Sequence, residues 1–148
     1  MEDAKKSFLT IKLIHFAIVA GLIMFACIVI LSNFKKISLT PAFDNPIAIV
    51  TSIFCIGSIG LSLAIPVIFT RIASLPKDAR SALMQYQVFC ITRWAVIEGG
   101  ALFCCIVTFM TSNTLAVLFL VILTALLIYR YPSQKEFVAL MEKRKQST

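Results

Sequence analysis

The chain has 148 residues, of which 59% are hydrophobic, and its mean hydropathy is +0.94. Soluble globular domains contain fewer apolar residues, so this composition predicts one domain, residues 1–148, that lies in a lipid bilayer. A net charge of +7 would favour nucleic-acid binding in a soluble protein, but here the basic residues fall in short segments between apolar runs, where they set membrane orientation. The expected partner is therefore the lipid bilayer and not nucleic acid.

The first apolar run extends from Leu13 to Leu31, and His15 is its only strongly polar side chain. The run is longer than the hydrophobic region of a signal peptide, and no small-residue cleavage site follows it. We therefore interpret it as a retained transmembrane helix that covers residues 10–33 approximately.

The second span is predicted over residues 46–70 approximately. Asn45-Pro46 is typical of an N-cap followed by proline at the first helical position. Pro66 is expected to kink the helix or to free a carbonyl near its end. A polar segment follows, and Pro76 within it can open a helix that continues into the next span.

The chain is almost wholly apolar from Val88 to Tyr129, which is too long for one crossing of a bilayer. The run therefore predicts two spans, over about 87–111 and 114–131, joined in a tight hairpin at Thr111-Ser112-Asn113-Thr114. The fourth span is short, and Arg130 is expected to anchor its end at the membrane interface.

Beyond Pro132, the segment from Ser133 to Glu136 has the pattern of a helix capping box. It predicts a short helix at the membrane interface, and the alternative is a disordered basic tail. On the helical interpretation, the residues of the apolar face are Phe137, Leu140 and Met141.

Orientation is predicted from the lysines and arginines on the two sides of the membrane, because cytoplasmic loops carry the excess. One side has eleven, namely Lys5, Lys6, Lys12, Arg71, Lys77, Arg80, Arg130, Lys135, Lys143, Arg144 and Lys145. The other side has only Lys35 and Lys36. The fold class expected is an all-α bundle of four transmembrane helices with short loops and both termini in the cytoplasm.

The cysteines, which are Cys27, Cys55, Cys90, Cys104 and Cys105, all lie within apolar runs. They show no metal-ligand spacing, and we interpret them as packing residues between helices rather than as disulfide or metal-binding residues. No metal or cofactor is expected.

Three ionisable residues fall within the predicted spans: His15, Arg93 and Glu98. A charged group in the bilayer costs several kcal/mol, so each is a candidate for ion or proton binding. Arg93 and Glu98 are about 140° apart on the helix, which is not the geometry of an i, i+4 pair. Each residue also has a structural interpretation. Glu98 could bond to Arg93, to a neighbouring serine (Ser58 or Ser62) or to another subunit; Arg93 could extend outward beside Trp94; and His15 could be a hydrogen-bonded packing residue.

Small residues lie beside Glu98 and in the second span, where they would let helices approach closely. These candidate packing residues are Gly57, Gly60, Gly99 and Gly100.

The run from Arg93 to Phe103, RWAVIEGGALF, resembles the carboxylate-bearing helix of the rotor proteolipids (subunit c) of rotary ATPases. The resemblance implies that Glu98 would carry a transported proton or sodium ion. Span two, with Gly57 and Gly60, differs from the glycine-repeat helix of that family. The whole pattern is similar to small four-span bacterial inner-membrane proteins, which implies an inner-membrane location and no particular activity.

Two functions are therefore considered. The first is binding or relay of a proton or cation through Glu98, with His15 and Arg93, in a homo-oligomer or with other membrane subunits. The alternative is a structural or assembly subunit in which Arg93 and Glu98 fix helix packing. An enzyme is the least favoured class, because the sequence has no Ser/His/Asp grouping, metal-ligand cluster or phosphate-binding glycine loop.

Overall fold

A computed structural model describes residues 2–35, 46–72 and 79–146. All regular structure in these ranges is α-helical, and the helices are α1 (Glu2–Asn33), α2 (Pro46–Ile72), α3 (Ala79–Thr111), α4 (Thr114–Tyr129) and α5 (Gln134–Gln146). The predicted N-cap Asn45 and the helix start at Pro76 lie outside the described residues. So do the side chains of Lys5, Lys6, Lys36, Lys77, Arg80, Leu140, Met141, Lys143, Arg144 and Lys145.

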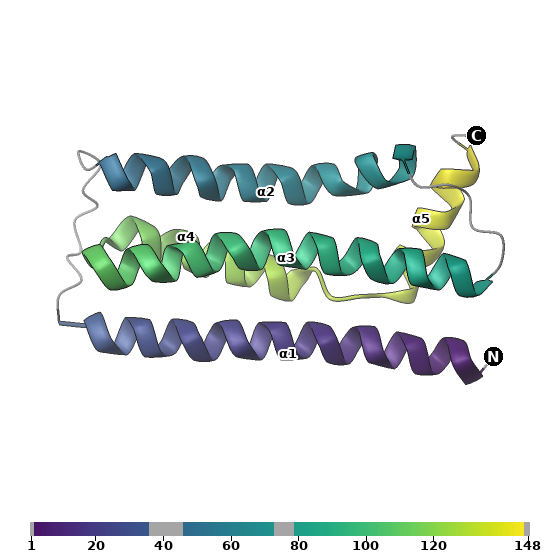
Figure 1. Cartoon of the computed structure of the whole chain (residues 1–148), viewed down its shortest axis with the longest axis horizontal. Helices are drawn as coiled ribbons and strands as arrows, with labels where there is room; N and C mark the ends of the chain where they lie inside the picture. The colour runs from purple at the N-terminus through teal and green to yellow at the C-terminus, as the bar shows by residue number, and fades with distance from the viewer. Residues whose placement is uncertain (1, 36–45, 73–78, 147–148) are drawn as a thin grey trace.

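Helices α1 to α4 lie lengthwise along one another, and α5 crosses one end of the bundle (Figure 1). The N- and C-termini lie at that same end. Helix α3 is the central element, because its contacts with α1, α2 and α4 are each more extensive than any contact among those three helices. Its inner face is buried at Trp94, Ile97 and Ala101, against Leu123 and Leu127 of α4.

Three helices in the described part of the chain are long and apolar enough to cross a membrane, over Phe8–Asn33, Pro46–Arg71 and Ser81–Thr111. Helix α4 is apolar but has only 16 residues, which is about 24 Å at 1.5 Å per residue. The prediction of an all-α protein with apolar, membrane-length helices is confirmed at this level. The fourth crossing stays a prediction.

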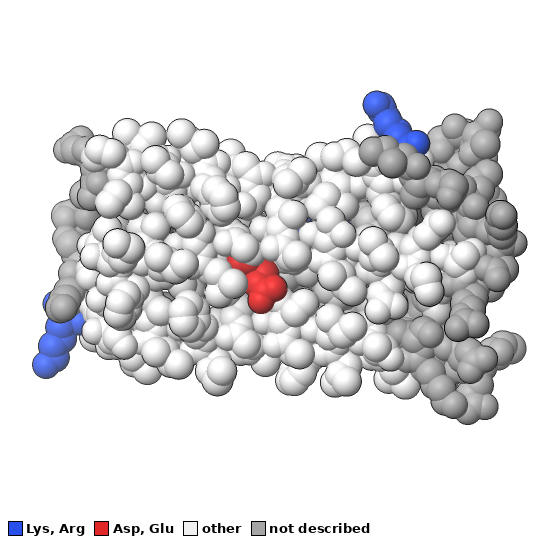
Figure 2. Space-filling view, viewed as in Figure 1, with Lys and Arg blue, Asp and Glu red and all other residues white. Residues whose placement is uncertain are grey.

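The outer surface of the bundle is apolar between its two ends. Figure 2 shows basic side chains only at the ends of this face, and one acidic group about midway along it. Large apolar side chains such as Leu13, Phe16, Ile53 and Met110 are exposed. In water such a surface would aggregate, whereas in a bilayer it faces lipid.

The α3–α4 turn is tight, as the sequence predicts. Ser112 adopts a left-handed conformation (φ 54°) and its N–H donates to Thr108 O at 2.9 Å, which ends α3. Asn113 then caps α4 by accepting a hydrogen bond from Leu115 N at 2.9 Å. The Ser112 hydroxyl also donates to Asn33 Oδ1 at 3.3 Å, so the turn is tied to the end of α1.

The structure shows where α2 begins and that the helix continues past Pro66. The helix begins at Pro46, as predicted, and it continues through Pro66 to Ile72. Cys55 of α2 and Cys104 of α3 are both buried, with their sulfur atoms 3.1 Å apart as free thiols. This contact agrees with a packing role for these two cysteines.

Gly100 marks the closest approach of α3 to its neighbours. A Cβ built at this position would lie 2.9 Å from Ser58 Oγ, 3.0 Å from Ser58 Cβ and 3.2 Å from Leu123 Cδ1. The absence of a side chain at Gly100 is therefore what allows α2 and α4 to pack on the same stretch of α3.

We expect Gly100→Ala to lower the free energy of unfolding by about 1–3 kcal/mol, because the added methyl group overpacks the contact with Ser58 and Leu123. Gly60→Ala is the control. Its Cβ would meet nothing within 4 Å, so it should stabilise α2 by about 0.5–1 kcal/mol through helix propensity. Unfolding in mixed detergent micelles measures both, and equal effects of the two variants would contradict this packing.

Candidate functional site

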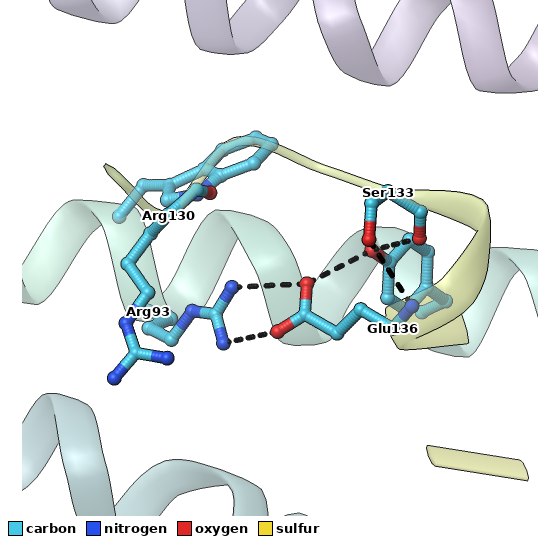
Figure 3. A network of polar contacts seen from close by, with 6 residues as sticks. Arg93, Arg130, Ser133 and Glu136 are labelled. Atoms are coloured by element: carbon cyan, nitrogen blue, oxygen red, sulfur yellow. Dashed lines mark hydrogen bonds and ion pairs between the residues drawn. The ribbon is translucent and has the colours of Figure 1, made fainter. Parts of the chain in front are cut away.

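Arg93 is the largest buried charge of the bundle, with 1% of its surface exposed. Its guanidinium group forms a two-pronged ion pair with Glu136 of α5, from Nη1 to Oε1 at 2.6 Å and from Nη2 to Oε2 at 3.3 Å (Figure 3). The face of Phe89 lies 4.9 Å from the same guanidinium group. A bidentate carboxylate is the strongest partner that a buried arginine can have.

The start of α5 brings Glu136 to this position. Ser133 is the N-cap, since its Oγ accepts a hydrogen bond from Glu136 N at 3.1 Å. This confirms the serine half of the predicted capping box. The Glu136 carboxylate bonds to Arg93 and also accepts a hydrogen bond from the Tyr86 hydroxyl at 3.2 Å, while the same hydroxyl lies 3.2 Å from Ser133 O. Helix α5 is thereby fixed to α3 at three atoms.

His15 and Trp94 both donate to the carboxyl end of α4. His15 Nε2 lies 3.0 Å from Leu127 O, and Trp94 Nε1 donates to Arg130 O at 3.1 Å. A carbonyl can only accept, so the Nε2 atom of His15 must carry the proton. The last carbonyls of a helix have no partner within the helix, and buried ones need an outside donor. The rings of His15 and Trp94, whose centroids lie 4.7 Å apart, supply these donors.

The three ionisable residues of the predicted spans do not form one cluster. Arg93 neither extends outward nor pairs with Glu98, because its partner is Glu136. The expected serine partners of Glu98 are also engaged elsewhere: Ser58 donates to Phe54 O and Ser62 to Ile59 O. The structure therefore separates a buried Arg93–Glu136 pair from a lone Glu98.

Glu98 is half-buried, and none of the other described residues forms a hydrogen bond or ion pair with it. Among the described acidic side chains, Glu136 and Glu142 belong to α5 and Glu98 alone belongs to the middle of a long helix. Figure 2 shows one acidic group surrounded by uncharged side chains at mid-length of the bundle. Glu98 thus presents a carboxyl on a surface that is otherwise apolar.

The glycines divide into two groups. Gly100 is at a helix–helix contact, whereas a Cβ at Gly57, Gly60 or Gly99 would meet nothing within 4 Å. Gly57 and Gly99 instead line an open, mainly apolar groove of about 610 Å³ between α2 and α3. Within this chain, therefore, only Gly100 has the packing role that the sequence led us to expect of all four.

Glu136 is the functional residue that the sequence analysis missed. It was assigned only to the capping box, although a buried arginine requires an acid at its own depth and Glu136 is one of five acids on the predicted cytoplasmic side. That requirement was the available signal. Among the described residues no group of three or more His, Cys, Asp or Glu side chains could hold a metal ion.

Comparisons with protein-family models, with characterised proteins and with solved structures gave no significant match. The resemblance of residues 93–103 to the rotor proteolipids stays a prediction.

We expect Glu136→Gln to destabilise the protein by about 2 kcal/mol, because it leaves the buried Arg93 charge without a counter-ion while keeping the shape of the side chain. Glu142→Gln, an exposed carboxylate on the same helix, should change stability by less than about 0.5 kcal/mol. Thermal unfolding in detergent measures both, and limited proteolysis should cleave α5 faster in the first variant alone. Equal stability of the two variants would show that the pair contributes nothing.

Proposed function

We propose that this chain is a small multi-pass membrane protein with four transmembrane helices and both termini in the cytoplasm, located in a bacterial inner membrane. Three apolar helices of membrane length support the membrane location, and so does the surface between the basic ends, which is apolar except for an acidic group at mid-length. The excess of lysine and arginine at the end that carries both termini supports the orientation. The short α4 spans with the help of Tyr131, which lies under the Lys12 ammonium group at 5.6 Å and anchors that end at the interface.

We propose further that the protein is an assembly subunit, and that it associates with a second copy of itself through the outer face of α3 around Glu98. One observation carries this proposal: Glu98 is a half-buried carboxyl on an apolar surface with no partner in the described chain, whereas Arg93 and His15 are both satisfied internally. A carboxyl that faces lipid costs several kcal/mol. A hydrogen bond to a neighbouring helix removes much of that cost.

The surroundings of Glu98 also favour a helix–helix contact. Gly99, the next residue after Glu98, lines a groove between α2 and α3. Small residues such as Gly57 alternate there with larger apolar ones such as Phe54, so a second apolar helix can pack in it. Arg93 and His15 bond to other groups of this chain, so only Glu98 requires a partner from a second copy.

Glu98→Leu should weaken self-association in lipid by about tenfold or more, because the hydrogen bond across the interface is lost. Glu98→Gln should keep most of the association, since the amide can still donate and accept. Glu142→Gln is the control for a lost carboxylate outside the apolar belt. Single-molecule photobleaching in nanodiscs or liposomes counts the copies, and an unchanged distribution for Glu98→Leu would contradict the proposal.

Binding or relay of a proton or cation at Glu98 is the second candidate, and the same observation favours it, because Arg93 does not neutralise this carboxyl. Liposomes that contain the protein should then dissipate an imposed pH or sodium gradient, and Glu98→Gln should abolish the flux while leaving assembly intact. No flux from assembled wild-type protein would leave assembly as the only role of Glu98.

A further inference from the structure

A cavity of about 210 Å³ lies where α2, α3 and α5 meet, at the end of the bundle that carries both termini. This is several times the roughly 30 Å³ that one water molecule occupies in the liquid. Its lining residues are Pro66, Val67, Thr70, Phe89, Arg93, Arg130, Glu136 and Ala139.

The charges on this cavity do not balance. Among the described residues, Arg93 and Arg130 line it with two guanidinium groups, and Glu136 lines it with the single carboxylate. Figure 3 shows the Arg93 guanidinium facing Glu136, and Arg130 reaching past Arg93 on the side away from that carboxylate. Since Glu136 neutralises only one positive charge, the cavity keeps an excess of one.

Two hydrogen-bond donors of the same arginines also favour an anion in this cavity. Nε of Arg93 and Nε of Arg130 are both buried, and neither has a hydrogen-bond partner among the described residues. Arg93 is 1% exposed, so an acceptor for its Nε has to lie inside the bundle or in this cavity. A buried donor without an acceptor costs about 1–3 kcal/mol, and an anion in the cavity would remove this cost for both arginines.

Phosphate fits these donors, because its oxygens accept several hydrogen bonds from guanidinium groups at once. Most of the remaining wall is apolar, from Pro66 and Val67 of α2, Phe89 of α3 and Ala139 of α5. Thr70 of α2 is the polar member of the wall, and its hydroxyl donates to Val67 O. The cavity also lies at the end of the apolar belt, where headgroups meet acyl chains. We propose that this cavity binds the phosphate group of an anionic phospholipid between Arg93 and Arg130. The site does not depend on Glu98 or on self-association.

Lipid titration of the purified full-length chain in detergent tests the site, with thermal unfolding and native mass spectrometry as readouts. Phosphatidylglycerol should raise the melting temperature and remain bound, whereas phosphatidylcholine and inorganic phosphate should not. Arg130→Gln should weaken phosphatidylglycerol binding by about tenfold, which corresponds to one charge-assisted hydrogen bond. Arg71→Gln is the matched control: an exposed arginine at the same end that does not line the cavity, so its affinity should stay within about twofold of wild type.

A second variant tests the same site if Arg130→Gln does not fold. Ala139 is exposed and lines the cavity, so Ala139→Leu should fill it and weaken lipid binding without removing any charge. Equal losses in Arg71→Gln and Arg130→Gln would overturn the proposal, since they would indicate diffuse attraction to basic residues. So would undiminished binding by Ala139→Leu. Saturation by inorganic phosphate alone would overturn the assignment to a lipid and leave a site for a small anion.

Discussion

The position of α5 across the end of the bundle depends on the ion pair between Arg93 and Glu136. A guanidinium group that is 1% exposed in the bundle must have a counter-ion, and among the described residues that counter-ion is Glu136 of α5. The chain therefore has to return over the bundle after α4, and Ser133 and Tyr86 hold α5 in the orientation that presents the carboxylate. A pair of this kind adds little net stability compared with apolar residues of equal volume, but it selects one position for α5 over all others.

The shortness of α4 explains the other buried polar groups. Because α4 ends at Tyr129, before the bundle ends, its last carbonyls lie among packed side chains and need donors. Arg130 N supplies Leu126 O from within the chain, and His15 and Trp94 supply the next acceptors from α1 and α3. His15 therefore has a hydrogen bond of the kind expected of a packing residue, and its part in proton relay stays a prediction.

Interactions between residues close in the sequence made much of the fold predictable. The site was mostly not predicted, because its contacts join residues that are far apart in the sequence. Apolar run lengths identified the helices, and short-range signals identified their ends at Pro46, Ser112-Asn113 and Ser133, because caps and turns act within a few residues. The partner of Arg93 is 43 residues away and could not be found by spacing. Nor could periodicity show which glycine faces a neighbour, since lipid and protein interior are both apolar. The pairing of Arg93 with Glu98 was one of several alternatives, and the helix geometry already argued against it, since the two residues are about 140° apart on α3.

Arg93 has a bonding partner within the described chain and Glu98 has none, and this difference indicates which residue acts outside the bundle. Arg93, His15 and Trp94 are satisfied by the fold and can be explained by it. Glu98 cannot, because it lowers the stability of the isolated bundle in lipid and no other described residue compensates. A destabilising group that the fold does not need requires an explanation outside the single chain. A neighbouring helix or a bound cation would each supply the missing partner, and both would act on the outer face of α3, where the small side chains of Ala95 and Gly99 leave room for them.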